Sequence, residues 1–196
     1  MRNQRVDADQ ALVAAAQAGD SDAVTALVHR YQTRIYNFAL AMTGNAADAE
    51  DLAQETFIRA FRGLRRFRGD SSFRNWLYRI AANAAHTLRG TRLRQSPVWE
   101  ARVESDDVAE RQLAGGGESV ERQAIRRQAI DRALAALPVE LRTAVVLHDV
   151  EGLEYHEIAE AMDVPIGTVM SRIFRARRRL RPLLSEVRDN RVLVKS

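Results

Sequence analysis

The chain has 196 residues, of which 46% are hydrophobic and 6% aromatic, and its 30 basic and 26 acidic side chains leave a formal net charge of +4. This length accommodates one large or two small domains. The absence of cysteine excludes disulfides and thiolate metal sites. The start MRNQRVDADQ has no apolar signal core, and no run reaches the roughly 18 apolar residues of a membrane helix, so we expect a cytoplasmic protein without membrane contact of its own.

Alanine, leucine, arginine and glutamate dominate, and strand-like alternation is nearly absent, which predicts an all-α fold. We expect a short helix over residues 9–18 and a longer one over about 21–43, separated by Gly19, with Asp20 or Ser21 as the cap of the second. The buried face of the longer helix is expected to contain Ala23, Leu27, Tyr31, Ile35, Phe38 and Met42.

A third helix is predicted over residues 48–64, after a break at Gly44 and Asn45. Apolar spacing of three and four predicts that its inward face consists of Ala53, Phe57, Ala60, Phe61 and Leu64. The outward face carries Asp51, Gln54, Glu55 and Ile58. Taken alone, that face is ordinary exposed helix surface, with acids near the N-terminus where they favour the helix dipole.

A basic loop at 65–72 leads into a helix predicted over about 73–89, and no acid occurs between residues 71 and 99. The helix is expected to face outward with Arg79, Asn83 and His86, and inward with Leu77, Ile80, Ala81, Ala84 and Leu88. Arginines beside aromatic rings are typical of proteins that hold single-stranded nucleic acid. The alternative is that Phe67, Phe73 and Trp76 are core residues, which we favour for Phe73 and Trp76.

The charge changes sign over residues 98–121, which contain seven acids and two arginines, follow Pro97 and include three consecutive glycines. This composition predicts a flexible acidic linker. It divides the chain into a first domain at 1–97, a second domain at 122–186 and a short tail at 187–196. In the second domain we expect helices from about 120 to 137 and from 139 to 150.

Residues 153–180 are typical of a helix-turn-helix, with an acidic first helix, a break at 163–167 and a cationic second helix. The second helix is expected to bury Ile166, Val169, Ile173, Ala176 and Leu180. Its other sides carry Thr168, Ser171, Arg172, Phe174, Arg175, Arg178 and Arg179. Six arginines and no acid occur between 171 and 181, which favours DNA binding, although a solvated arginine face on an ordinary bundle helix is the alternative.

Three segments in this order resemble the extracytoplasmic-function sigma factors of the sigma-70 superfamily: DAEDLAQETFIRAFRGL, FRGDSSFRNWLYRIAANAAH and LPVELRTAVVLHDVEGLEYHEIAEAMDVPIGTVMSRIFRARRRL. The resemblance covers about residues 8–184. It implies a bacterial RNA polymerase subunit with two small helical domains, sigma-2-like and sigma-4-like, joined by the acidic linker. The linker resembles the family segment that threads the RNA-exit path of the polymerase.

The resemblance also implies roles for individual residues. Binding to the β′ clamp helices of core polymerase is expected from Asp51, Gln54 and Glu55, with Ile58 beside them. The loop that receives a flipped base of the minus-10 element corresponds to Phe67, Arg68, Gly69, Asp70, Ser71 and Ser72, while Asn83 matches a position that contacts an extruded base, with Arg79 and His86 on the same face. Reading of the minus-35 element is expected from Ser171, Arg172, Phe174 and Arg175, flanked by Thr168 and Arg178.

Further partners follow from the same resemblance. The second domain is expected to meet the β flap of the polymerase, and promoter DNA is expected to bind both as duplex and as melted strand. The match does not extend to the inhibitory region or the middle domain of larger sigma factors, so an anti-sigma factor gripping both domains is implied, which could hold the protein at the inner membrane. Met170 departs from the family, since some relatives have arginine there.

Two other classes of protein remain for comparison. A stand-alone helix-turn-helix regulator would use only the second domain and would leave the outward face of residues 51–58 and the basic loop unexplained. A nuclease or recombinase would need clustered metal-binding carboxylates or a positioned nucleophile, and neither is found. The four histidines, His29, His86, His148 and His156, are scattered. We therefore expect no enzyme activity, no cofactor and no metal.

Overall fold

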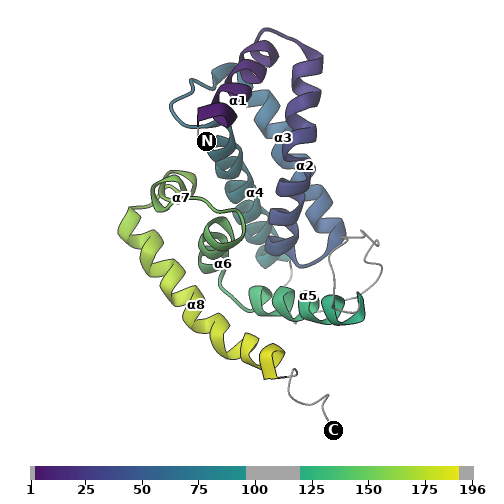
Figure 1. The fold of residues 1–196 in the computed structure, drawn as a ribbon, viewed down its shortest axis with the longest axis vertical. Helices are drawn as coiled ribbons and strands as arrows, with labels where there is room; N and C mark the ends of the chain where they lie inside the picture. Colours follow the sequence, from purple (N-terminus) through teal and green to yellow (C-terminus); the bar gives the residue numbers. More distant parts are fainter. Residues whose placement is uncertain (1–2, 96–119, 190–196) are drawn as a thin grey trace.

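In the computed structural model, which describes residues 3–95 and 120–189, both described ranges are built from helices and contain no strand (Figure 1). This agrees with the predicted all-α fold. The elements are α1 (Asn3–Gln17), α2 (Ser21–Thr43), α3 (Ala46–Gly63), the short 3-10 helix η1 (Leu64–Arg66), α4 (Phe73–Gln95), α5 (Val120–Ala135), α6 (Val139–Val145), the π-helix η2 (Val146–Val150), α7 (Tyr155–Met162) and α8 (Ile166–Asp189).

Local capping explains where the first helices begin and end. The Asp20 carboxylate accepts the backbone N–H groups of residues 22 and 23 and so starts α2, as predicted. Gly44 ends α2 in the left-handed region at φ +80°, and Asn45 caps α3 through the N–H of Asp48. All six side chains predicted for the inner face of α2 are buried, and Leu27, Ile35 and Phe38 are fully enclosed.

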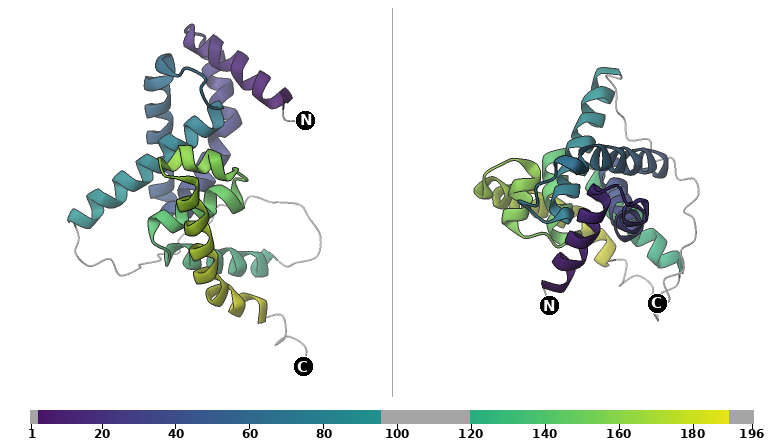
Figure 2. Two further views of the ribbon diagram at one scale, coloured as in Figure 1. Left: turned by 90° about the vertical axis from the view of Figure 1, so that its left-hand side faces the viewer. Right: turned by 90° about the horizontal axis from the view of Figure 1, so that it is seen from above.

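Several helices are longer than the sequence predicts. α1 begins at Asn3 instead of residue 9, and α3 begins at Ala46, directly after its cap. α4 continues to Gln95, six residues past the predicted end, because Gly90 is accommodated inside the helix and no proline follows before Pro97. The C-terminal part of α4 projects away from the other helices (Figure 2).

The second half of the chain also departs from prediction in places. The single helix expected over 139–150 is divided into α6 and the π-helix η2, in which the N–H of Glu151 bonds the carbonyl of Val146. α5 starts at Val120, so the predicted linker lies, over residues 98–119, outside the described residues. α8 runs to Asp189 with Pro182 inside it, so the helix extends past residue 187, where the tail was expected to start.

The two helical groups, α1–α4 and α5–α8, pack against each other and share one apolar core. α7 lies along α4, and α5 and α6 meet the C-terminal end of α2 (Figure 1). The Arg142 side chain is buried at this junction, where it donates to the carbonyl oxygens of Met42, Ala135 and Leu137. Among the helices of both described ranges, none is long and apolar enough to span a bilayer.

Candidate nucleic-acid and polymerase interfaces

The outward face of α3 is available to a partner. Asp51, Gln54 and Ile58 are exposed, Glu55 is half-buried, and the neighbouring Arg59 Nε donates to Glu55 Oε1 at 2.6 Å. Ile58 is 37% exposed and lies among the acids and the amide, so this face offers a partner an apolar side chain as well as charged groups. A surface of this kind suits a protein partner better than nucleic acid, because phosphates repel carboxylates.

The backbone conformation at Phe67 and Gly69 and a cap at Ser72 define the loop at 67–72. η1 ends at Arg66, Phe67 is extended, and Gly69 has φ +77°, where a side chain would strain the backbone. At the far end the Ser72 hydroxyl accepts the N–H of Asn75 and caps α4. The exposed residues are Arg68, Gly69 and Asp70, with Ser71 and Ser72 half-buried.

Three aromatic rings pack against one another beside this loop. Phe73 is only 3% exposed and Trp76 is half-buried against the core, as expected for both. Phe67 is also half-buried, and its ring centroid lies 4.9 Å from that of Trp76 and 6.2 Å from that of Phe73. The alternative that Phe67 is a packing residue is therefore partly correct, and the loop residues after it are the ones left open to solvent.

On α4, the side chains of Arg79, Asn83 and His86 are exposed on one face, as predicted. The predicted inner residues Leu77, Ala81 and Ala84 are buried, and Ile80 and Leu88 are half-buried. The sequence spacing therefore identified both faces of this helix correctly.

Helix α8 buries Val169, Ile173 and Ala176, and half-buries Leu180, which confirms most of its predicted apolar stripe. Ile166 is the exception, because it is 47% exposed. It is the first residue of the helix, directly after Pro165, whose carbonyl accepts the first helical N–H groups, so the packed stripe starts only one turn later. On the other sides Phe174, Arg175, Arg178 and Arg179 are exposed, and Thr168, Ser171 and Arg172 are half-buried.

Comparison with known proteins identifies the class to which this arrangement belongs. Residues 27–94 match the family model for Sigma-70 region 2, and residues 127–180 match that for Sigma-70, region 4. The chain is 42% identical to the RNA polymerase sigma-H factor of Pseudomonas aeruginosa over 91% of its own length and 96% of the relative's. The chain belongs to the extracytoplasmic-function sigma factors of the sigma-70 family. It is an RNA polymerase sigma factor, a transcription initiation factor.

Other relatives agree with this assignment. The ECF RNA polymerase sigma-E factor of Escherichia coli K12 is 41% identical, over 86% of this chain and 90% of the relative. Two solved structures are similar at 27% identity: CnrH in complex with the cytosolic domain of CnrY, with a TM-score of 0.68 over 92% of this chain and 99% of the other, and RpoE in complex with the anti-sigma factor NepR from Bartonella quintana, with a TM-score of 0.64 over 82% and 96%.

The arginines of this sigma factor's α8 are not equivalent. Arg177 turns back toward η2, where its guanidinium bonds Asp149 and lies 3.2 Å from His148 Nδ1. The bond from Arg177 holds the pKa of Asp149 below its usual range. Arg175 Nε and Nη2 donate to the carbonyl and hydroxyl oxygens of Ser171, one turn earlier. Arg178 and Arg179 lie exposed beyond them.

A small cleft between the two halves of the sigma factor is lined from α4 by Asn83 and His86 and from α8 by Arg172, and Thr143 and Met162 also line it. The structure thus brings together residues predicted for two different promoter elements. The outward face of α3 contributes nothing to this cleft.

Polar contacts between α4 and the segment around α7 were not predicted from the sequence. The Tyr78 hydroxyl donates to the Glu151 carboxylate, Arg74 donates to the Glu151 carbonyl, and Asn75 Nδ2 donates to Glu157 Oε1 at 3.0 Å. Burial, together with this hydrogen bond to Glu151, raises the pKa of Tyr78. These partners are 73 to 82 positions apart in the sequence, and nothing in the local pattern indicates such a pairing.

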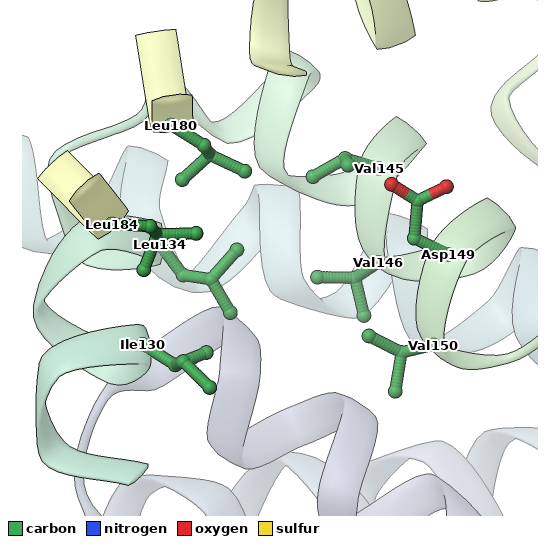
Figure 3. Close-up of a pocket in the computed structure, with 8 residues that line it drawn as sticks. All are labelled: Ile130, Leu134, Val145, Val146, Asp149, Val150, Leu180 and Leu184. Carbon is green, nitrogen blue, oxygen red and sulfur yellow. The ribbon is translucent and has the colours of Figure 1, made fainter. Parts of the chain in front are cut away.

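An apolar cleft that the sequence did not reveal lies on the second half of the sigma factor. In Figure 3, side chains of α5 and α8 face those of α6 and η2 across it. Its lining consists of Ile130, Leu134, Val145, Val146, Asp149, Val150, Leu180 and Leu184. Ile130 and Val150 at this cleft are 41% and 62% exposed, so apolar surface is open there. Within residues 3–95 and 120–189 no group of acids and histidines is arranged to hold a metal.

Proposed function

We propose that this sigma factor binds core polymerase through α3, captures a melted base of the minus-10 element with the 67–72 loop and α4, and reads the minus-35 element with α8. The observation that carries the proposal is that all three surfaces assigned from the sequence have exposed side chains, each backed by a buried core. The domains proposed for these roles are residues 1–97 and 122–186, joined by the acidic linker at 98–121 and followed by a tail.

The proposed minus-10 site comprises the loop residues Phe67, Arg68, Gly69, Asp70, Ser71 and Ser72 and the α4 residues Arg79, Asn83 and His86. Extruding a base costs about a few kcal/mol of stacking and pairing, and capturing that base offsets the cost only for the right sequence. The exposed Asn83 amide can donate to and accept from a base edge. The loop backbone turns at Gly69 in the left-handed region, and no other atom of the described residues lies within 4 Å of the place a Cβ would take there, so a base could approach this turn.

The proposed minus-35 site lies on α8 and comprises Thr168, Ser171, Arg172, Phe174, Arg175 and Arg178. A recognition helix contacts base edges with residues near its N-terminus. Arginine binds guanine O6 and N7 in bidentate fashion, which is worth about 1 to 3 kcal/mol of discrimination. Met170, 51% exposed on the same helix, cannot make such a contact, so the preferred minus-35 sequence should differ from that of relatives with arginine there.

Polymerase binding is proposed to use two surfaces. Asp51, Gln54, Glu55 and Ile58 are proposed to meet the β′ clamp helices. The apolar cleft beside Ile130 and Val150 is proposed to receive an apolar segment of the β flap, because open apolar surface on a soluble chain commonly marks a protein contact.

Control by an anti-sigma factor is supported by the similar structure of the sigma factor RpoE in complex with the anti-sigma factor NepR, and the similar structure of CnrH also contains a bound partner, the cytosolic domain of CnrY. We propose that an anti-sigma factor grips both halves of this chain as well. The protein is proposed to act in the cytoplasm, where polymerase and chromosome lie, with tethering to the inner membrane only through that partner. It is proposed to have no enzyme activity and to need no cofactor.

The experiment that tests this proposal adds the purified chain to sigma-free core polymerase with fragments of its own genome. We expect promoter-specific run-off transcripts that disappear when Asp51, Gln54 and Glu55 are all changed to alanine. Glu50→Ala, at an exposed acid of the same helix, is the matched control. Sequence-specific duplex binding without any binding to polymerase would favour the stand-alone regulator instead.

A further inference from the structure

The side chain of Gln17, the last residue of α1, reaches the start of the 67–72 loop. Its Nε2 donates to the carbonyl oxygen of Leu64 at 2.9 Å and to that of Phe67 at 2.8 Å. Gln17 precedes these acceptors by 47 and 50 positions and lies outside the matched Sigma-70 region 2, which starts at residue 27. α1 therefore contributes directly to the conformation of this loop.

The two carbonyl groups lie where the chain changes direction. Leu64 O also accepts the N–H of Phe67, which closes η1, and Phe67 is the first extended residue after it. Both N–H bonds of one carboxamide are thus used to hold the entry of the loop. The exit is held separately, by the bond from the Asn75 N–H to the Ser72 hydroxyl. Residues 68–71 are left between two fixed ends.

α1 is itself anchored, so it can act as a rigid support. Asp9 pairs with Arg30 and accepts the Tyr31 hydroxyl at 2.5 Å, and Val13 is buried against α2. Gly19, at φ +100°, turns the chain directly into α2. A carboxamide at the end of this anchored helix fixes the loop relative to the bundle.

We propose that Gln17 is a positioning residue for capture of the flipped minus-10 base. The inference rests on the proposed role of the 67–72 loop. A loop held in its binding conformation before the base arrives does not lose further conformational freedom on capture. Loss of the two hydrogen bonds should therefore slow promoter opening without weakening the binding of polymerase.

The variants separate hydrogen bonding from side-chain volume. Gln17→Met keeps the length of the side chain and removes both donors, whereas Gln17→Lys keeps a donor at the end of a long side chain. Gln10→Met makes the same change at an exposed position of the same helix. A first measurement uses the full chain without DNA: the Phe67 amide, which is bonded to the Leu64 carbonyl, should exchange faster in Gln17→Met, and as slowly as in the parent chain in Gln17→Lys and Gln10→Met.

The second measurement uses holoenzyme and a promoter with 2-aminopurine at the minus-10 base that flips, so that fluorescence reports extrusion. On duplex promoter, we expect Gln17→Met to slow the fluorescence rise by about three- to tenfold, as for the loss of one or two net hydrogen bonds. Gln17→Lys should restore most of the rate. Affinity for core polymerase should be unchanged in all variants, which a general folding defect would not allow.

Replacing both loop residues, Arg68 and Ser71, with alanine tests the loop itself. This variant separates the proposed role of Gln17 from the proposed capture of a base by the loop. If the loop variant loses the fluorescence signal while Gln17→Met keeps both normal exchange and a normal rate, the role of Gln17 is overturned and base capture by the loop stands. If the loop variant also opens the promoter normally, base capture by this loop is wrong, and the inference about Gln17 fails with it. Failure of Gln17→Lys to rescue would also count against hydrogen bonding as the cause.

Discussion

Arg175 and Arg178 are both exposed on α8, but their settings differ. Arg175 follows Ser171 by one turn and bonds its carbonyl and hydroxyl oxygens, which aligns the guanidinium along the helix surface. Arg178 lies nearly one turn further toward the C-terminus, farther from the end of the recognition helix that meets base edges. The first is therefore suited to reading a base and the second to binding phosphate.

We predict that Arg175→Ala weakens binding to a minus-35 duplex and relaxes its sequence preference, because a bidentate guanine contact worth about 1 to 3 kcal/mol is lost. Arg178→Ala should weaken binding to all sequences alike and reduce the salt slope by about one unit. Titration of matched and mutated duplexes by the holoenzyme at several salt concentrations measures both. Equal effects of the two substitutions on every sequence would contradict the base-reading role of Arg175.

Asn83 is the other single residue for which the structure supports a sharp expectation. Its amide is exposed on α4, away from the outward face of α3. We predict that Asn83→Ala leaves polymerase affinity intact and slows promoter opening, because one contact to the extruded base is lost. Stopped-flow opening kinetics on a linear duplex measure this, and a premelted template should relieve the defect. Unchanged kinetics on the duplex would exclude Asn83 from base capture.

At the scale of elements, Arg142 joins three segments. It is 6% exposed and donates to the last turn of α2, to the end of α5 and to the connection before α6. Carbonyl groups at helix ends have no partner within their own helix, so a buried guanidinium satisfies several of them at once. The packing of α5 and α6 on α2 therefore depends on this side chain.

We predict that Arg142→Met lowers the free energy of unfolding by about 2 to 4 kcal/mol, because buried carbonyl oxygens lose their donor. Thermal unfolding of the full chain measures the change as a lower midpoint. Arg132→Met, at an exposed arginine of α5, should leave the midpoint nearly unchanged. A midpoint for Arg142→Met equal to that of this control would show that the three bonds contribute little to stability.

The sequence predicted these elements well where local signals exist. Asp20 and Gly44 start and end α2 through bonds to nearby residues, as predicted, whereas Asn45 was expected only in the break and proves to be the cap of α3. The π-helix η2 and the exposure of Ile166 could not be predicted from the sequence. The formation of η2 depends on how α6 packs, and the exposure of Ile166 depends on where the packing of α8 begins. Periodicity predicts which side of a helix is apolar, but not how far along the helix a neighbour reaches.

At the scale of the whole molecule, α4 and the α7 segment hold the two halves together. The arrangement places Asn83 and His86 in one cleft with Arg172, although they are proposed to bind different promoter elements. One small cleft cannot hold two separate DNA segments. We therefore expect the halves to move apart when both elements are bound.

We predict that removing the bonds from Tyr78 to Glu151 and from Asn75 to Glu157, with Tyr78→Phe and Glu157→Ala, separates the halves in the free protein. Because the chain has no cysteine, Thr33→Cys and Arg181→Cys at exposed positions allow a specific dye pair. Energy transfer should fall in the variant, and also in the parent chain when holoenzyme binds a promoter. Glu160→Ala, at an exposed acid of α7, is the control, and unchanged transfer in the double variant would refute a holding role for these bonds.

The sequence by itself determined the helical fold, many helix ends and the outward faces of α3, α4 and α8, because each is encoded in residues a few positions apart. It also determined the family, through three segments that occur in a fixed order. Only the tertiary structure decided that Gln17 binds carbonyl groups 47 and 50 positions away, that Arg142 binds one 100 positions away, and that Tyr78 meets Glu151. Every residue offers a carbonyl oxygen, so the sequence holds no signal that selects one acceptor. That selection depends on how the packed helices bring distant backbone together.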